Sequence, residues 1–377
     1  MHWVFPIKLR IKHYLYATKT MVYWMRFSFF FTTLIAALSC VAYWCAYLQP
    51  ARFGAGFMAM SIPIWLIINA ILFIFIWPKK GIKPALPPLF ALVAGARFVF
   101  STVAFHPTAH ANPNDLNVVS YNVHMFGRHE QNKELTASLR KTVTTELISL
   151  QPDVICFQEY LEGLDNTKIT KLFREAGLKH SFFSPALEGW VRERGGMVIF
   201  SRYPIIKTKA FRRQKLDMNQ ILYADIVTPT ETIRVFNVHL QSNRVRAEYF
   251  EQDQDEQEAK RSIYLVYKKL NKGFELRAKQ VKQLEAEIAK SPHPVIVCGD
   301  FNDLPYSYTY TRTQRTLQNA FEKAGNGLGF SFNGFLPFLR IDQQFASKNL
   351  KVTSFQTHRW PYSDHFPIQA TYRHEKP

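Results

Sequence analysis

The stretch CGDFNDLP, residues 298 to 305, places acidic and amide side chains directly after an apolar run. The run from Val295 to Cys298 is rich in β-branched residues, which predicts a buried strand that ends at Gly299. Asp300 and Asn302 then fall in a loop, where a rigid sheet can hold carboxylates for chemistry. Because Asp, Asn and Gly are also common turn formers, this stretch by itself leaves a purely structural role open.

Other predicted strands end in the same kinds of residue. The stretches SYNVH, CFQEY and NVHLQSN follow apolar runs with an amide, a carboxylate and an imidazole, and RIDQQF and SDHFP add two aspartates and a histidine. A lone His or Asp usually has a structural role, but a chain that needed only to fold would gain nothing by placing so many ligand-type side chains on one rim. The candidate site residues are Asn122, Glu159, His239, Asp300, Asn302, Asp342, Asp364 and His365.

The elements that position these residues alternate between strands and helices. Residues 135–150 predict a helix, and the proline-free stretch 244–290 predicts helical structure with a break at Gly273. The predicted fold class is α/β, a four-layer sandwich of two central sheets flanked by helices and preceded by a transmembrane helical region. Strands are expected at 118–121, 154–157, 197–200, 233–240, 295–298, 341–345, 352–355 and 368–372.

From about Asn117 to Tyr372 the chain resembles the endonuclease/exonuclease/phosphatase superfamily, which includes pancreatic deoxyribonuclease, abasic-site endonucleases, neutral sphingomyelinases and inositol polyphosphate 5-phosphatases. The motifs SYNVH, CFQE, GGMVIFSRYPI, NVHL, GDFND, RID and SDHFP occur in the order of that family, and the ordered set is far more specific than any single motif. The resemblance implies a metal-dependent phosphoric ester hydrolase with a four-layer sandwich fold. Oxygen ligands favour Mg²⁺ or Mn²⁺, and no Cys or His group has the spacing of a zinc site.

The resemblance also implies roles for the candidate residues. Glu159 is expected to be the main metal ligand, with Asn122 and Asp364 close to the metal or its waters. Asp300 is expected to orient and deprotonate the attacking water, and Asn302 to hold a phosphate oxygen.

A histidine–aspartate pair completes the implied site. His365, held by Asp342, is expected to stabilise the charge that develops on phosphorus, and His239 is expected to contact the phosphate from the other side. Many relatives have an aromatic residue directly after this aspartate, whereas Gln343 follows Asp342 here. This difference puts the support of His365 in question.

The first third of the chain has a different composition. Residues 27–48 and 53–77 carry no charged side chain, and each stretch is long enough to cross about 30 Å of hydrocarbon. Residues 84–105 are interrupted by Arg97 and are expected to form a third span. The chain is therefore divided into a basic segment at 1–26, a transmembrane region at 27–105 and a catalytic domain at 106–377.

The distribution of cations predicts the topology. Lysine and arginine residues precede the first span and follow the second as Lys79, Lys80 and Lys83, whereas only Arg52 lies between the two spans. By the positive-inside rule the N-terminal segment and the second loop are cytoplasmic. A third span would then place the catalytic domain outside the cytoplasm, and its failure to cross would place the domain inside. We predict an integral protein of a bacterial inner membrane with an extracytoplasmic catalytic domain, in which residues 1–26 are not a cleavable signal peptide.

The net charge of +18 does not by itself predict nucleic-acid binding. Residues 1–105 hold ten cations and no acid, which leaves 37 cations against 29 acids in the rest of the chain. This balance suits an anionic substrate or a membrane surface. Tyr306, Tyr308 and Tyr310 could stack on nucleotide bases, but we favour a turn that packs on the sheet. All four cysteines are expected to be buried thiols.

The predicted function is a membrane-anchored, Mg²⁺-dependent phosphodiesterase or phosphatase that acts on lipid headgroups or other small phosphate esters, with the bilayer as a partner. A nuclease acting on DNA or RNA is the alternative within the same chemistry, so nucleic acid is a less favoured partner. A non-catalytic, membrane-anchored binding protein is the second alternative. It is disfavoured because every expected acid, amide and imidazole is present.

Overall fold

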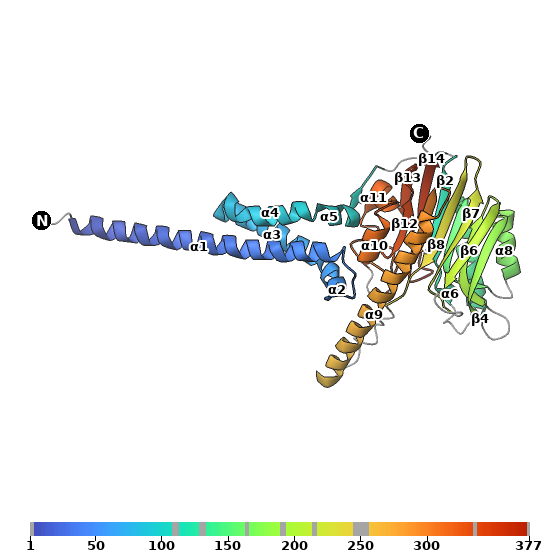
Figure 1. The fold of residues 1–377 in the computed structure, drawn as a ribbon, viewed down its shortest axis with the longest axis horizontal. Helices are drawn as coiled ribbons and strands as arrows, with labels where there is room; N and C mark the ends of the chain where they lie inside the picture. The colour runs from blue at the N-terminus through green and yellow to red at the C-terminus, as the bar shows by residue number, and fades with distance from the viewer. Residues whose placement is uncertain are drawn as a thin grey trace.

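The computed structural model describes residues 4–107, 112, 114–127, 133–162, 166–188, 194–212, 217–243, 256–334 and 338–374. An α/β sandwich lies at one end of the molecule, and long apolar helices extend from it (Figure 1). The sandwich has the layer order helix, sheet, sheet, helix, which confirms the predicted fold class.

Two six-stranded sheets form the centre of the sandwich. The first has the strand order β13-β14-β2-β3-β5-β4, and the second has the order β10-β12-β9-β8-β7-β6. The pairs β2/β3 and β8/β9 are parallel, and the other neighbours are antiparallel. The strands are β2 Leu116–Asn122, β3 Val154–Glu162, β4 His180–Glu188, β5 Arg194–Ser201, β6 Ile205–Arg212, β7 Gln220–Val227, β8 Thr232–His239, β9 Val295–Asp300, β10 Gln318–Asn319, β12 Asp342–Ala346, β13 Leu350–Thr357 and β14 Ile368–His374. A separate two-stranded sheet pairs β1 Ala104–Phe105 with β11 Asn326–Gly327.

The core lies between the two sheets and beneath the flanking helices. Small and β-branched side chains such as Val118, Val235 and Ile296 interlock between the sheets and are fully buried. Period-two alternation directs the opposite side chains of the same strands outward. Helices α7 Lys133–Ser149 and α8 Asn166–Glu175 cover the first sheet, and α9 Glu256–Ala289 and α10 Tyr308–Thr313 cover the second.

The predicted break at Gly273 is wrong, because α9 continues through it. A Cβ at this position would lie 2.5 Å from Asn243 Oδ1 and 3.0 Å from Arg277 Nη1. The glycine therefore lets the segment after β8 approach the helix closely.

Six strands were not predicted: the long strands β4, β6 and β7 and the two-residue strands β1, β10 and β11. Strand β7 is buried along nearly its whole length yet carries Asp225. Arg234 on the neighbouring strand β8 satisfies this carboxylate through two bonds of 2.6 and 2.8 Å. An analysis of one strand at a time does not predict β7, because its buried Asp225 is tolerated only next to Arg234 on the neighbouring strand.

The apolar region consists of α1 Val4–Cys45, α2 Ala55–Met60, α3 Ile62–Lys80, α4 Ile82–Ala94 and α5 Ala96–Thr102. The first expected span, 27–48, lies mostly in α1, which ends at Cys45. The second, 53–77, is divided between α2 and α3, because Gly54 is left-handed and Ser61 separates the two helices. The third, 84–105, is bent by 51° between α4 and α5 and ends in β1. By length and composition, Val22–Cys45 and Ile62–Lys79 can each cross a membrane, and the bent pair can form one further span.

The apolar helices pack on one another and on the sandwich. Asn69 of α3 donates to the hydroxyl of Ser39 on α1 at 2.7 Å, and Thr32 of α1 donates to the carbonyl of Pro84 on α4 at 3.0 Å. Arg340 of the sandwich donates to the carbonyl of Ser101 at the end of α5. The apolar helices are thus joined to the sandwich by buried polar contacts as well as by the chain.

Gly299 allows β9 to lie against β8 just before the first candidate residue. Its φ is +140°, and a Cβ there would meet the carbonyl oxygen of Val238 at 2.0 Å. We expect Gly299→Ala to destabilise the protein by about 2–4 kcal/mol, measured by denaturant unfolding of the sandwich. Gly327→Ala is the control, since its φ of +72° is also left-handed but its Cβ would enter open space. Equal losses from the two variants would contradict the steric argument.

Candidate active site

Strand register brings the first three candidate residues together. His239 ends β8 and pairs with Asp300, which ends the parallel strand β9. Asp300 in turn pairs with Asp342, the first residue of the antiparallel strand β12. The ends of two parallel strands and the start of their antiparallel neighbour lie on the same edge, so three ligand-type side chains share one rim.

Asp300 is the centre of this rim. Its side chain is buried, and its Oδ1 accepts the backbone N–H of Asn302 at 2.8 Å. Its Oδ2 accepts the amide groups of Asn302 at 3.0 Å and of Asn122, from the other sheet, at 3.1 Å. Burial raises the pKa of the Asp300 carboxyl, against the lowering effect of the neighbouring imidazole of His365. A carboxylate with a raised pKa is a better acceptor for a proton from water.

Two imidazoles face the same oxygen of Asp300. Nε2 of His239 lies 3.6 Å and Nε2 of His365 lies 3.7 Å from Asp300 Oδ2. Both distances exceed normal hydrogen-bond length, so the Nε2 atom of each ring remains available to another group. His239 is held from behind by the carbonyl of Met218, 3.1 Å from its Nδ1.

His365 and Asp342 form the predicted pair. Nδ1 of His365 lies 2.8 Å from Asp342 Oδ2, and both side chains are buried. Burial alone lowers the pKa of His365, but the carboxylates of Asp342 and Asp300 outweigh it and raise the pKa to about 10. The ring is therefore cationic at neutral pH, with Asp342 fixing one nitrogen and the other directed at Asp300.

Glu159 occupies a strained position on β3. Its φ is +49°, and it lies at the irregularity where the register with β5 shifts between Phe157 and Tyr160. Among the described residues its nearest charged partner is His239, whose Nε2 is 3.7 Å from Glu159 Oε1. A non-glycine residue in the left-handed region is uncommon and often marks a functional site. Both carboxylate oxygens are positioned to take a further ligand.

Asp364 is connected to Asn122 indirectly, through its neighbour Ser363 and through His124. Ser363 donates to the carbonyl of Asn122 at 2.9 Å, and His124 Nδ1 lies 3.4 Å from Asp364 Oδ1. The short element α6 His124–Gly127 is a left-handed turn, with φ of +43° to +55° from His124 through Phe126. This turn brings His124, which the sequence motifs did not single out, to the rim.

The structure therefore brings all eight candidate residues into one connected group. Their assignment as metal ligands or catalytic groups stays a prediction. Within the described chain, Asp300, Asp342 and His365 are the one group of three whose ligand atoms all lie within 4.8 Å. The bond between the His365 ring and Asp342 leaves this trio less suited to a metal ion, since a cationic imidazole is a poor metal ligand. The acidic rim can hold a divalent ion, and Glu159 with Asn122 and Asp364 offers the oxygen donors that a hard cation prefers.

The departure at Gln343 does not weaken the pair. Its side chain is buried and points to Arg340, whose Nη1 donates to Gln343 Oε1 at 2.6 Å. Support for the pair comes from residues that the motifs missed. The hydroxyl of Ser331 accepts the backbone N–H of Asp342 at 3.0 Å, and the ring of Phe332 packs edge-on against His365 at 5.1 Å.

The tyrosines near residue 310 are not a stacking platform. Tyr308 and Tyr310 are buried in α10, and Tyr310 packs on Phe345 and donates to Glu322 at 2.7 Å. The packing role favoured from the sequence is confirmed, although the segment is a helix and not a turn. The four cysteines are free, and Cys40 is half-buried whereas the other three are buried.

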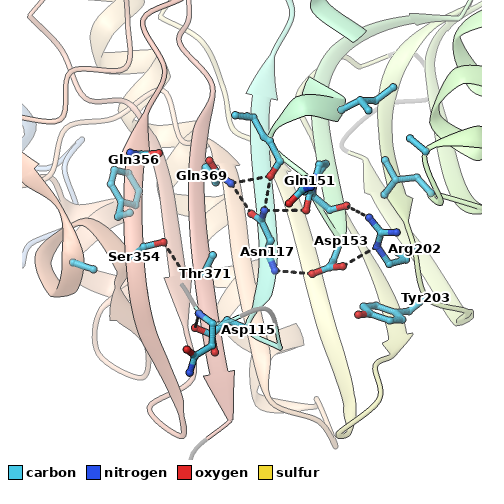
Figure 2. A pocket seen from close by; sticks show the side chains of 18 of the residues that line it. Asp115, Asn117, Gln151, Asp153, Arg202, Tyr203, Ser354, Gln356, Gln369 and Thr371 are labelled. Atoms are coloured by element: carbon cyan, nitrogen blue, oxygen red, sulfur yellow. Dashed lines mark hydrogen bonds and ion pairs between the residues drawn. The ribbon is translucent and has the colours of Figure 1, made fainter. Parts of the chain in front are cut away.

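A large cleft lies elsewhere, at the opposite ends of β2 and β3 (Figure 2). It has a volume of about 1090 Å³, but its polar groups bind one another. Arg202 pairs with Asp153 at 2.9 Å, and Asp153 accepts the backbone N–H of Asn117 at 3.0 Å. Gln369 donates to Asn117 at 3.0 Å. We interpret it as a structural network, because its carboxylates are already paired, Asp153 with Arg202 and Asp115 with Arg373.

A four-layer sandwich with an acidic rim, a buried carboxylate and an aspartate–histidine pair defines the phosphoesterase class of α/β sandwiches. A family model described as "Endonuclease/Exonuclease/phosphatase family" matches residues 119–365. The chain belongs to this family, whose members are generally hydrolases that act on phosphoesters. A second model, a domain of unknown function (DUF8431), matches residues 25–102, and no curated protein sequence matches the chain.

One similar solved structure agrees on the fold, and a second shows a weaker similarity. An endonuclease/exonuclease/phosphatase from Beutenbergia cavernae has a TM-score of 0.51 at 17% identity, over 69% of this chain and 72% of that chain. The catalytic domain of human Nocturnin with a bound sulfate anion has a TM-score of 0.48 at 17% identity, over 70% of this chain and 94% of that chain.

The geometry predicts that His365 and Asp342 act as a unit. We expect His365→Ala and Asp342→Ala each to lower kcat by about 10² to 10⁴-fold, because each removes the oriented imidazolium. The double variant should be little slower than the slower single variant. Losses that multiply in the double variant would show that the two side chains act independently.

Glu159 is expected to dominate metal binding. We expect Glu159→Gln to weaken Mn²⁺ binding at least about tenfold in calorimetric titration, because it removes a full charge but keeps the shape. Glu175→Gln is the control, since Glu175 lies at the exposed end of α8. Unchanged affinity in the Glu159 variant would exclude it as the main ligand.

Proposed function

We propose that the chain is a membrane-anchored, Mg²⁺-dependent phosphoric ester hydrolase that acts on phosphodiester or phosphomonoester groups of lipid headgroups or small phosphate esters. Mn²⁺ is the alternative ion. The observation that carries the proposal is the convergence of His239, His365, Asn122 and Asn302 on one oxygen of Asp300. This places two amide donors and two imidazole nitrogens around a buried carboxylate that is suited to act as a general base.

The residues fit a definite division of labour. Asp300 takes the proton of the attacking water, since its raised pKa suits it to that role. The imidazolium of His365 donates from its Nε2 to a phosphoryl oxygen, and His239, when protonated, contacts the phosphate from the other side. Asn302 reaches a phosphoryl oxygen by exchanging one of its amide bonds to Leu240 and Asp300. A divalent ion held at Glu159 would supply charge neutralisation and a lower pKa of bound water.

The apolar helices support the membrane anchor. Many large side chains of α1 and α3 are exposed on the outside of the helix pair, among them Phe30 at 67% and Ile74 at 61%. An exposed apolar surface of this kind is costly in water and suits hydrocarbon. A lipid substrate would lie near an enzyme tethered in this way.

The arrangement of the helices supports a third crossing. The end of α1, the start of α3 and the end of α5 all lie next to the sandwich, whereas the turn from α3 to α4 lies at the far end (Figure 1). That turn carries Lys79, Lys80 and Lys83, which the positive-inside rule assigns to the cytoplasm. The bent pair α4 and α5 then returns across the membrane, with the sandwich on the extracytoplasmic side.

Substrate class is tested by a hydrolysis screen of the full chain in nanodiscs. The panel contains bis(p-nitrophenyl) phosphate, p-nitrophenyl phosphate, phospholipids and DNA, each with Mg²⁺ or EDTA. We expect phosphate-ester cleavage that EDTA abolishes and that Asp300→Asn lowers at least about 10³-fold. Preferential cleavage of DNA would favour the nuclease alternative, and no cleavage by folded, metal-binding protein would favour a binding role.

Topology is tested by reporter fusions. Alkaline phosphatase, which is active only outside the cytoplasm, is fused after Pro377 and, as the matched control, after Gly81 between α3 and α4. We expect activity from the first fusion and none from the second. An inactive fusion after Pro377, whatever the activity of the fusion after Gly81, would place the sandwich in the cytoplasm.

A further inference from the structure

The first half of α9 carries large apolar side chains that are mostly exposed in the described structure. The C-terminal half of the helix packs on the second sheet through Val281 and Leu284. Farther toward the N-terminus, Ile263 is 66% exposed, Tyr264 is 62% exposed and Tyr267 is 51% exposed. Exposed apolar residues clustered on one stretch of helix indicate an interaction surface.

The same stretch is strongly basic. Between Lys260 and Lys272 the sequence has five cations and no acid. Arg261 and Lys268 are exposed beside the apolar residues. A helix that combines tyrosine and aliphatic side chains with lysine and arginine is typical of segments that lie in the interface of an anionic bilayer.

The stretch is located where the apolar helices leave the sandwich. The ring of Tyr267 stacks on Phe57 of α2 with centroids 4.9 Å apart, and Phe274 packs edge-on against the same ring at 5.2 Å. Helix α2 joins the end of α1 to the start of α3, so this contact lies at the end of both candidate spans. The N-terminal end of α9 points back toward the side on which α1 and α3 extend (Figure 1).

The loop before α2 carries a matching pair of residues. Phe53 is 96% exposed, and Arg52 beside it is exposed. An exposed aromatic ring at the end of a membrane span is most stable in the headgroup layer. There the ring can contact lipid, and the neighbouring cation can contact phosphate groups.

We infer that residues 260–268 of α9, together with Arg52 and Phe53, bind the surface of the same bilayer that α1 and α3 span, with anionic phospholipid as the partner. This inference rests on the proposed membrane anchoring. The anchoring helices bring the surface to the membrane, and the cations match its negative charge.

The contact would also orient the active site. Arg277 lies 14 residues beyond Ile263, which is about 21 Å along the helix axis. Its Nη1 donates to the carbonyl of Gln241 and to Asn243 Oδ1, both at 2.8 Å, and its Nε lies 3.2 Å from Asp303 Oδ2. Gln241 and Asp303 flank His239 and Asn302 in the sequence. One rigid helix therefore holds the rim at a set distance from the lipid surface.

Contact between residues 260–268 and lipid is tested by photo-crosslinking of the full chain in nanodiscs of phosphatidylglycerol. The photoreactive residue p-benzoylphenylalanine is placed at position 263, at position 71 in α3 as the positive control, and at position 282, an exposed site on the C-terminal half of α9, as the matched negative control. Lipid adducts are measured by mass spectrometry. We expect adducts at 71 and 263 and none at 282, with the yield at 263 falling about threefold or more in phosphatidylcholine.

The outcomes separate this inference from the proposed function. Adducts at 71 without adducts at 263 would overturn the interfacial contact and leave the anchor intact. Equal yields at 263 and 282 would also overturn it, because contact would then not be confined to the basic stretch. Absence of adducts at 71 would remove the anchor itself and the inference with it.

A second measurement links the surface to catalysis. The double variant Ile263→Asp, Tyr264→Asp is expected to hydrolyse lipid in vesicles at least about fivefold more slowly, with unchanged hydrolysis of soluble bis(p-nitrophenyl) phosphate. Lys282→Asp is expected to change neither rate. Equal loss on both substrates in the double variant would point to damage at the site and overturn an orienting role.

Discussion

The burial of one carboxylate, that of Asp300, constrains the whole catalytic unit. A carboxylate removed from water must be compensated by donors or cations, and no single strand can provide enough of them. Asn302 follows it in the chain, Asn122 comes from the other sheet, and His239 and His365 come from a neighbouring strand and a distant loop. The two sheets must therefore meet at this edge, and the resulting packing raises the pKa of Asp300.

Hydrogen bonds between buried amide side chains hold the two sheets in register at that edge. Gln158 of the first sheet donates to Ser120 at 3.1 Å and to Asn237 of the second sheet at 2.7 Å. Asn237 donates back to the carbonyls of Phe157 and Val198. Buried amide networks tolerate little displacement, because a shifted partner leaves an unsatisfied group. This amide network lies next to Asn122 and Glu159 in strands β2 and β3, and it keeps the ends of these strands opposite Asp300.

A second polar network joins the catalytic unit to the apolar helices. Arg97, which interrupts the third apolar stretch, donates to Gln314 at 2.9 Å, and Gln314 and Tyr310 both bind Glu322. Arg340 packs on Phe321 with its guanidinium 4.1 Å from the ring centroid and binds both Gln343 and the carbonyl of Ser101. Gln343, which replaces the aromatic residue of many relatives, thus helps to hold Arg340 in contact with α5. The residue directly before Gln343, Asp342, is bonded to His365, so the contact with the apolar helices and the candidate site share one strand.

Much of the fold and the site could be predicted because strand ends and ligand-type residues are local patterns. Each apolar run that was followed by Asn122, Glu159, His239 or Asp300 is a strand that ends at or near that residue. The failures concern contacts between distant segments. Gly273 fits a close approach by Asn243 and not a helix end, and β7 tolerates Asp225 only because Arg234 lies beside it. Ser331 gave no signal, because a serine in a loop is ordinary until its hydroxyl is seen to hold Asp342.

The sequence by itself determined the family, the order of the strands and the residue types of the site, since these depend on local hydrophobic patterns and on an ordered set of short motifs. It also determined that the first third is apolar enough for a membrane. Only the tertiary structure decided that two amides and two imidazoles meet on one oxygen of Asp300, that Glu159 takes a left-handed conformation, and that the basic stretch of α9 lies against the helix between two candidate spans. The physical reason is that these features are distances between residues remote in the chain, and such distances are set by how sheets and helices pack against one another.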